Sequence, residues 1–117
     1  MNMDRLDILV AGKVIETEIA ETARRVMLLM ENKYQIEEEA MEVMITHFAM
    51  ASQRIVRGDV VDKMNEDILN EIKSDKTYDR AMDILSDIKS LSDVDFPTSE
   101  EQFMLLHICN ILKGGEK

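Results

Sequence analysis

Residues Glu37 to Gly58, EEEAMEVMITHFAMASQRIVRG, have the periodicity of one long helix. Apolar residues recur at steps of three and four, which is the spacing of one face of an α-helix. The acidic start and the basic last turn complement the helix dipole, and Gly58 stands where a left-handed residue would end the helix. The run therefore predicts a helix over about 37–57, with a core face formed by Met41, Met44, Ile45, Phe48, Ser52 and Ile55.

The same period predicts four more helices. Ile15, Ile19, Thr22, Val26 and Leu29 place one over about 14–32. Asn65 is predicted to cap a short helix over 65–74, and a further helix follows over 76–91. The last helix, over 99–113, is apolar nearly all round and is preceded by Phe96-Pro97 and by the capping-box spacing of Thr98 and Glu101. We therefore expect it to be buried in a bundle or against a partner.

Turn formers are scarce, because the chain has four glycines and one proline. Ten methionines against five aromatic residues also favour helices over strands. We predict an all-α fold, a compact five-helix bundle spanning 14–113. Residues 1–13 would be an N-terminal extension in which Leu6–Val10 is extended or irregular, and 114–117 would be a frayed tail.

Composition limits the function. The 117 residues suit one domain, and the net charge of −10 disfavours direct binding to nucleic acid or to anionic lipid. The single cysteine, Cys109, cannot form an internal disulfide. The start of the chain lacks the pattern of a secretory signal, and no apolar stretch is long enough to span a membrane. A cytoplasmic location is therefore expected.

Two histidines, His47 and His107, are the residues best suited to chemistry. Both lie in apolar helical runs, where they should sit at the edge of the core. A neutral imidazole can act as a nucleophile toward phosphorus near pH 7. Arg54, two turns beyond His47 on the same face, could bind a phosphoryl group placed there.

Other readings of these residues are open. Each histidine could instead be a packing residue whose ring nitrogens bond to backbone or to a neighbouring side chain. A metal site is not expected, because His107 and Cys109 diverge on a helix and no HxxxH or CxxC motif is present. The glutamates at 37–39 and 100–101 are interpreted as helix-start electrostatics and not as an acid/base pair. No cofactor-binding loop and no convergent acid, base and nucleophile can be assembled, so we expect no enzyme activity.

Two segments resemble the histidine motifs of the phosphotransferase-system regulation domain. The first is THFAMASQRI, residues 46–55, followed by Gly58. The second is FPTSEEQFMLLHI, residues 96–108, in which a proline and acidic residues precede an aromatic residue four places before Leu-His-Ile. The separation of the histidines and the stretch from Val14 to Glu42 also fit, so the resemblance covers nearly the whole chain.

The resemblance implies a five-helix bundle that controls sugar-utilisation genes in bacteria. Phosphocarrier protein and sugar-permease components phosphorylate the histidines of such domains, which alters dimer packing and switches an attached effector. By position, His47 and His107 would be the phosphoacceptors here. With a single copy and no nucleic-acid-binding module expected in this chain, the domain would act as a stand-alone regulator, through a homodimer or a partner regulator.

One position differs from the family pattern. The first histidine of the family is commonly preceded by aspartate, whereas Thr46 stands here. This difference favours the alternative of a degenerate member that is not phosphorylated and serves as a dimerisation or scaffold domain.

Overall fold

The computed structural model describes residues 5–59 and 64–114. These residues form six helices and no strand, which confirms the all-α prediction and shows the count of five to be wrong. The first four residues of the predicted N-terminal extension, and all of the predicted tail except Gly114, lie outside the described part. The helices are α1 (Arg5–Ala11), α2 (Thr17–Tyr34), α3 (Glu38–Arg57), α4 (Glu66–Ser74), α5 (Tyr78–Leu91) and α6 (Thr98–Leu112).

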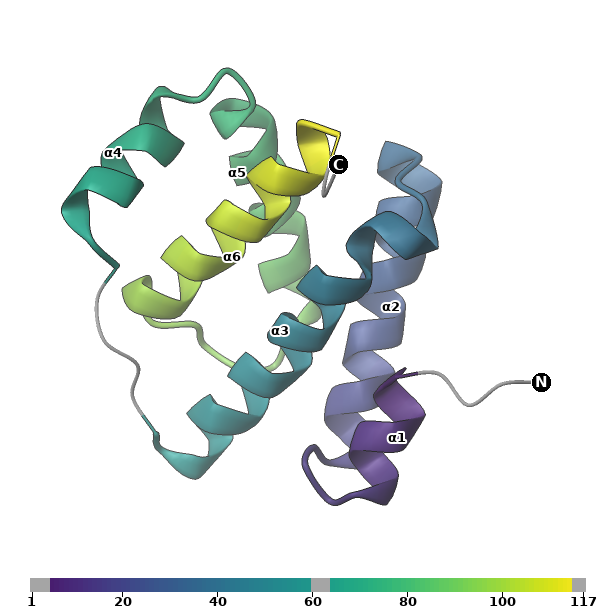
Figure 1. The fold of residues 1–117 in the computed structure, drawn as a ribbon. Coiled ribbons are helices and arrows are strands. Elements are labelled where there is room, and N and C mark those ends of the chain that lie inside the picture. The colour runs from purple at the N-terminus through teal and green to yellow at the C-terminus, as the bar shows by residue number, and fades with distance from the viewer. Residues whose placement is uncertain (1–4, 60–63, 115–117) are drawn as a thin grey trace.

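Two helical hairpins make up most of the bundle (Figure 1). Helices α2 and α3 form one, and α5 and α6 form the other. The hairpins meet where α3 packs on α6 and where α2 packs on α5. Helix α4 lies at the edge against α5 and α6, while α1 packs on α2 and α3 at the opposite side. The contact between α3 and α6 brings the two histidine-bearing helices together.

Helix α1 is the helix that the sequence analysis missed, since Leu6–Val10 was expected to be extended or irregular. Leu6 is buried, and Leu9 and Val10 pack against the core, so one side of a short helix faces inward. Lys13, in the left-handed region at φ 62°, ends the helix, and the Val14 N–H bonds back to the Leu9 carbonyl at 2.8 Å. Seven residues rarely form a helix alone, so this one depends on its packing against α2 and α3.

Two of the three predicted helix-end signals are confirmed. Gly58 has φ 84°, and its N–H and that of Asp59 bond to carbonyls of the last turn of α3. Asn65 caps α4, accepting from the Asp67 N–H at 2.8 Å. The predicted Thr98 capping box is wrong, because Pro97 occupies the N-cap and Thr98 already belongs to α6.

Methionines fill much of the core. Of the core face predicted for α3, Ile55 is partly buried and the other five residues are buried. Unbranched thioether side chains adapt to irregular gaps between helices, which suits a bundle with few aromatic residues. The fully buried side chains include Met30, Met41, Met44 and Met104, together with Phe48, whose ring stacks on Phe96 at 5.6 Å.

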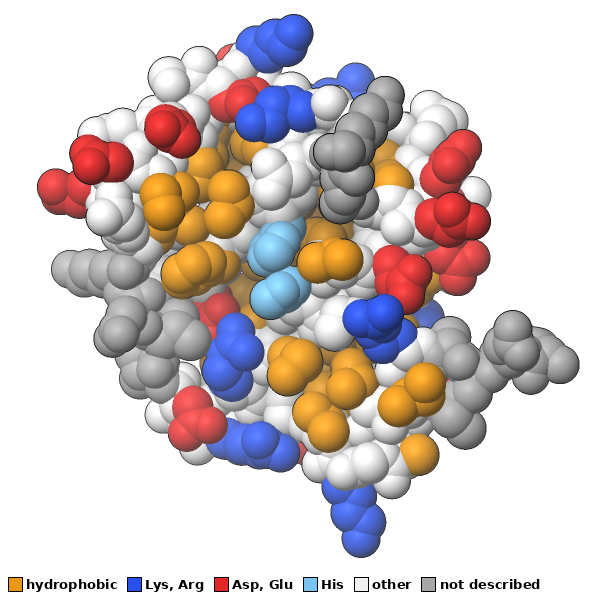
Figure 2. Space-filling model, viewed as in Figure 1, with side chains coloured by type: hydrophobic (Ala, Val, Ile, Leu, Met, Phe, Trp, Pro, Cys, Tyr) orange, Lys and Arg blue, Asp and Glu red, His pale blue; other side chains and the backbone are white. Residues whose placement is uncertain are grey.

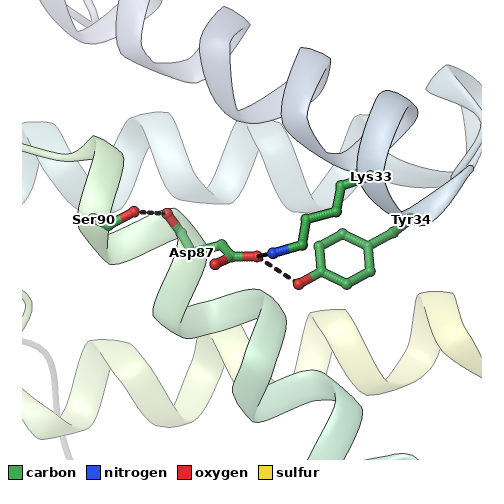
Figure 3. Close-up of polar contacts among 4 residues, drawn as sticks. All are labelled: Lys33, Tyr34, Asp87 and Ser90. Carbon is green, nitrogen blue, oxygen red and sulfur yellow. Dashed lines mark hydrogen bonds and ion pairs between the residues drawn. The ribbon is translucent and has the colours of Figure 1, made fainter.

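A polar cluster links α2 to α5 on the outside of the bundle (Figure 3). Asp87 accepts hydrogen bonds from Lys33 at 2.8 Å and from the Tyr34 hydroxyl at 2.5 Å. The hydrogen bond from Lys33 is the main reason why the pKa of Asp87 lies below its usual range. The cluster fastens the end of α2 to α5 and therefore helps to hold the two hairpins together. None of the described helices is long and apolar enough to cross a membrane.

Candidate functional site

The two predicted site histidines lie against each other. His47 comes from the middle of α3 and His107 from α6, and their rings stack with centroids 4.2 Å apart and planes 25° apart. Figure 2 shows the imidazoles side by side in the middle of one face of the molecule. Sequence reasoning placed each histidine at the edge of the core but did not predict this contact.

Both imidazoles are open to reaction. His47 is exposed and His107 is half-buried. Among the described residues neither ring has a hydrogen-bond partner, and no side-chain nitrogen of His107 is sealed from the surface. The alternative was that each ring nitrogen bonds to the protein's own groups. No such hydrogen bond exists in the described part of the chain. The site offers two imidazole nucleophiles in contact.

Burial keeps His107 neutral. Loss of solvent is the main cause that lowers its pKa from 6.5 to about 4, and the neighbouring charge of His47 lowers the pKa further. At pH 7 the ring of His107 therefore carries no charge, and one of its nitrogens has a free lone pair. A lone pair is what attack on a phosphorus atom requires.

The same pKa predicts how stability depends on pH. Because the pKa of His107 is lower in the folded chain than in the unfolded chain, the unfolded state binds more protons between about pH 6.5 and pH 4. The free energy of unfolding should therefore fall as the pH drops through this window. From pH 7 to pH 5 the contribution of His107 is about 1–2 kcal/mol, measurable by urea unfolding.

The control is His107→Gln, which removes the titrating group from the same place. Its stability should change less between pH 7 and pH 5 than that of the native chain. Asp87, whose pKa is also lowered, contributes mainly below about pH 4 and does not obscure the comparison. Equal pH dependence in the two proteins would show that His107 is not held neutral by the fold.

Arg54, the predicted phosphate partner, is engaged by a carboxylate. Its Nε and Nη2 donate to the two carboxylate oxygens of Glu100, at 3.2 and 3.0 Å. Glu100 is only 3% exposed, while the Arg54 side chain is 33% exposed. Sequence reasoning assigned Glu100 to helix-start electrostatics and missed this pairing. Apart from Glu100, the guanidinium has no hydrogen-bond or ion-pair partner among the described residues, so Arg54 can still bind an anion from solvent.

The histidine contact and the Arg54–Glu100 pair belong to one seam. Arg54 follows His47 by seven residues on α3, and Glu100 precedes His107 by seven residues on α6. Seven residues are about two helical turns, so on antiparallel helices the two contacts repeat along one line. We call these four residues the α3–α6 seam. The equal spacing was the available signal, but it identifies partners only once α3 and α6 are known to be neighbours.

Apolar side chains surround the seam at the surface. Val43 and Met50 on α3 and Phe103 on α6 lie one turn from a histidine and are 48%, 36% and 36% exposed. Figure 2 shows hydrophobic side chains on both sides of the imidazoles. We call this surface, with the two histidines, the histidine face. Helix α6 is thus not buried all round, as an apolar helix inside a bundle would be, but keeps part of its apolar surface on this face.

The described residues offer neither a metal site nor an accessible thiol. No group of three or more histidine, cysteine, aspartate or glutamate side chains in residues 5–59 and 64–114 could hold a metal ion. Cys109 is buried in α6 at 2% exposure, which withholds its thiol from reagents in solvent. On α3 and α6 the stacked histidines therefore remain the candidate site.

Comparison with known families gives one result. The family model described as the PRD domain matches residues 15–111. This match spans α2 to α6 and includes the whole α3–α6 seam. Searches of curated proteins and of solved structures gave no match.

Proposed function

Since the chain belongs to the PRD domain family, we propose that it is a regulatory domain of bacterial sugar utilisation, phosphorylated on His47 and His107 by proteins of the sugar phosphotransferase system. The stacked imidazoles support this proposal most directly, because they are accessible, have no hydrogen-bond partner among the described residues, and include one ring whose lowered pKa keeps it neutral. Phosphocarrier protein or sugar-permease components would be the donors, and the cytoplasm the place of transfer.

The transfer needs only an accessible lone pair. The imidazole nitrogen attacks the phosphorus of a donor phosphohistidine, a new N–P bond forms, and the N–P bond of the donor breaks. The donor imidazole keeps the electron pair and becomes neutral, and the acceptor keeps the proton on its other nitrogen. No acid, base or metal on this chain is required.

Arg54 is the proposed phosphate partner. It lies two turns beyond His47, and helical side chains lean toward the N-terminus of their helix, which for Arg54 is the direction of His47. Guanidinium and phosphoryl groups pair strongly through charge-assisted hydrogen bonds. Arg54 would keep its hydrogen bonds to Glu100 and offer the rest of its guanidinium to the phosphoryl group.

The consequence of phosphorylation would be altered association. The histidine face presents apolar side chains that a homodimer or a partner regulator could cover. A phosphoryl group adds about 1.5–2 negative charges in the middle of that face, which must be desolvated when a partner binds. We therefore expect phosphorylation to weaken association through this face and to favour another packing.

The test is transfer from the phosphocarrier. The full chain is incubated with phosphocarrier protein, its kinase and phosphoenolpyruvate, and its intact mass is measured before and after mild acid. We expect an acid-labile mass gain on the native chain and none on a His47→Gln, His107→Gln double variant. Sedimentation of the native and phosphorylated chains then measures association. If the native chain gains no mass, the phosphoacceptor proposal fails and the histidines are packing residues of a scaffold domain.

A further inference from the structure

We infer that the stacked pair of His47 and His107 accepts one phosphoryl group at a time, on either ring but not on both. The inference rests on the proposed function, and it defines the domain as a single two-state element rather than two independent sites. The observation that carries it is the ring contact itself, with centroids 4.2 Å apart and nearly parallel planes.

Contact between the rings makes the second transfer unfavourable. A phosphoryl group carries about 1.5–2 negative charges and three bulky oxygens. Two such groups on touching rings repel about two to four times as strongly as two unit charges at the same separation. Salt screens charges beyond roughly 8–10 Å, and the stacked rings hold two phosphoryl groups well inside that distance.

The backbone around the pair cannot easily open to relieve this repulsion. His47 sits between the buried residues Ile45 and Phe48, and His107 is followed by the buried Ile108 and Cys109. Two turns along the seam, Arg54 and Glu100 hold α3 to α6 through two hydrogen bonds. The remaining movement that could separate two phosphoryl groups is rotation of the exposed His47 side chain, which would break the stacking contact.

The charges near the pair favour the first phosphoryl group over a second. Arg54 is the cation of the seam and is already paired with Glu100, so it would have room for one phosphoryl group at most. Glu100 adds a carboxylate to the same seam, and the whole chain has a net charge of −10. We expect the second transfer to be at least about tenfold slower than the first.

Phosphoramidate tests the inference without any phosphotransferase protein. The lone pair of a neutral imidazole nitrogen forms an N–P bond, the P–N bond of the reagent breaks, and ammonia leaves with its electron pair. The other ring nitrogen keeps its proton. The full chain is treated at neutral pH until the reaction stops, and the number of phosphoryl groups is read from the intact mass under alkaline conditions.

We expect one phosphoryl group on the folded native chain and one on each of His47→Gln and His107→Gln. The matched control is the native chain in urea, where the rings are apart and two groups should add. Two groups on the folded chain would overturn the inference. So would modification of only one of the two single variants, because one site would then be inaccessible rather than excluded by the other. A folded chain that takes none would overturn it as well.

These outcomes separate the inference from the proposed function. A chain that accepts one group from phosphoramidate on either ring, but none from the phosphocarrier, keeps the inference and loses the proposed function. A chain that receives two groups from the phosphocarrier keeps the proposed function and loses the inference.

Discussion

Replacing Arg54 with methionine is expected to lower the free energy of unfolding by about 3 kcal/mol. Methionine replaces the aliphatic part of the arginine side chain with one of similar length but leaves Glu100 buried without a cation. Both carboxylate oxygens of Glu100 accept from Arg54, and Glu100 is 3% exposed, so water replaces the lost donors poorly. The partial exposure of Arg54 places the expected cost at the lower end of values for broken buried pairs. Urea unfolding at pH 7 measures the change.

Two further variants test the cause, and a third is a surface control. Glu100→Gln removes the buried charge and should cost less than Arg54→Met, because a neutral amide is easier to bury. The double variant Arg54→Met, Glu100→Leu also removes the buried Glu100 carboxylate that Arg54→Met leaves without a cation. It should therefore regain much of the stability lost in Arg54→Met. Lys33→Met, which breaks the more exposed pair with Asp87, is the surface control and should have a much smaller effect. Equal effects of Arg54→Met and Lys33→Met would contradict the buried-pair explanation.

The sequence was sufficient to predict α3, because its signals are local. The three-and-four spacing of apolar residues, the acidic start and Gly58 all belong to one continuous run, and the structure confirms the glycine at φ 84°. Helix α1 was not predictable in the same way. Its seven residues are too few for a clear period, and its stability comes from packing against α2 and α3, which no local pattern within α1 reveals.

The candidate site, too, was predictable only where its signals are local. His47 and His107 could be identified singly, since each stands out by residue type within an apolar helix. Their contact at 4.2 Å depends on the register between α3 and α6, which no local pattern contains. The pairing of Glu100 was missed for a related reason. An acidic residue in a first helical turn has a sufficient local explanation, and the structure does place Glu100 there, but its partner on α3 becomes visible only in three dimensions.

Phe48→Ala is expected to lower the free energy of unfolding by about 4 kcal/mol. Phe48 is fully buried beside His47, and its ring stacks on Phe96 with centroids 5.6 Å apart. The substitution removes buried apolar surface and leaves a cavity at the place where the segment before α6 packs onto α3. Because a domain of this size has a total stability of roughly 5–15 kcal/mol, thermal and urea unfolding should both show a large loss.

Phe103→Ala provides the matched control, since it makes the same chemical change on the histidine face. Phe103 is 36% exposed, so it loses less buried surface and should cost well under half as much as Phe48→Ala. The two variants should also differ in function. Phe48→Ala loosens the packing that sets Phe96 and the start of α6, and with it the register that stacks His107 on His47, whereas Phe103→Ala leaves that register intact. We therefore expect the folded Phe48→Ala chain to take up more than one phosphoryl group from phosphoramidate and Phe103→Ala to take up one; the same limit of one in both would show that ring stacking does not depend on this part of the core.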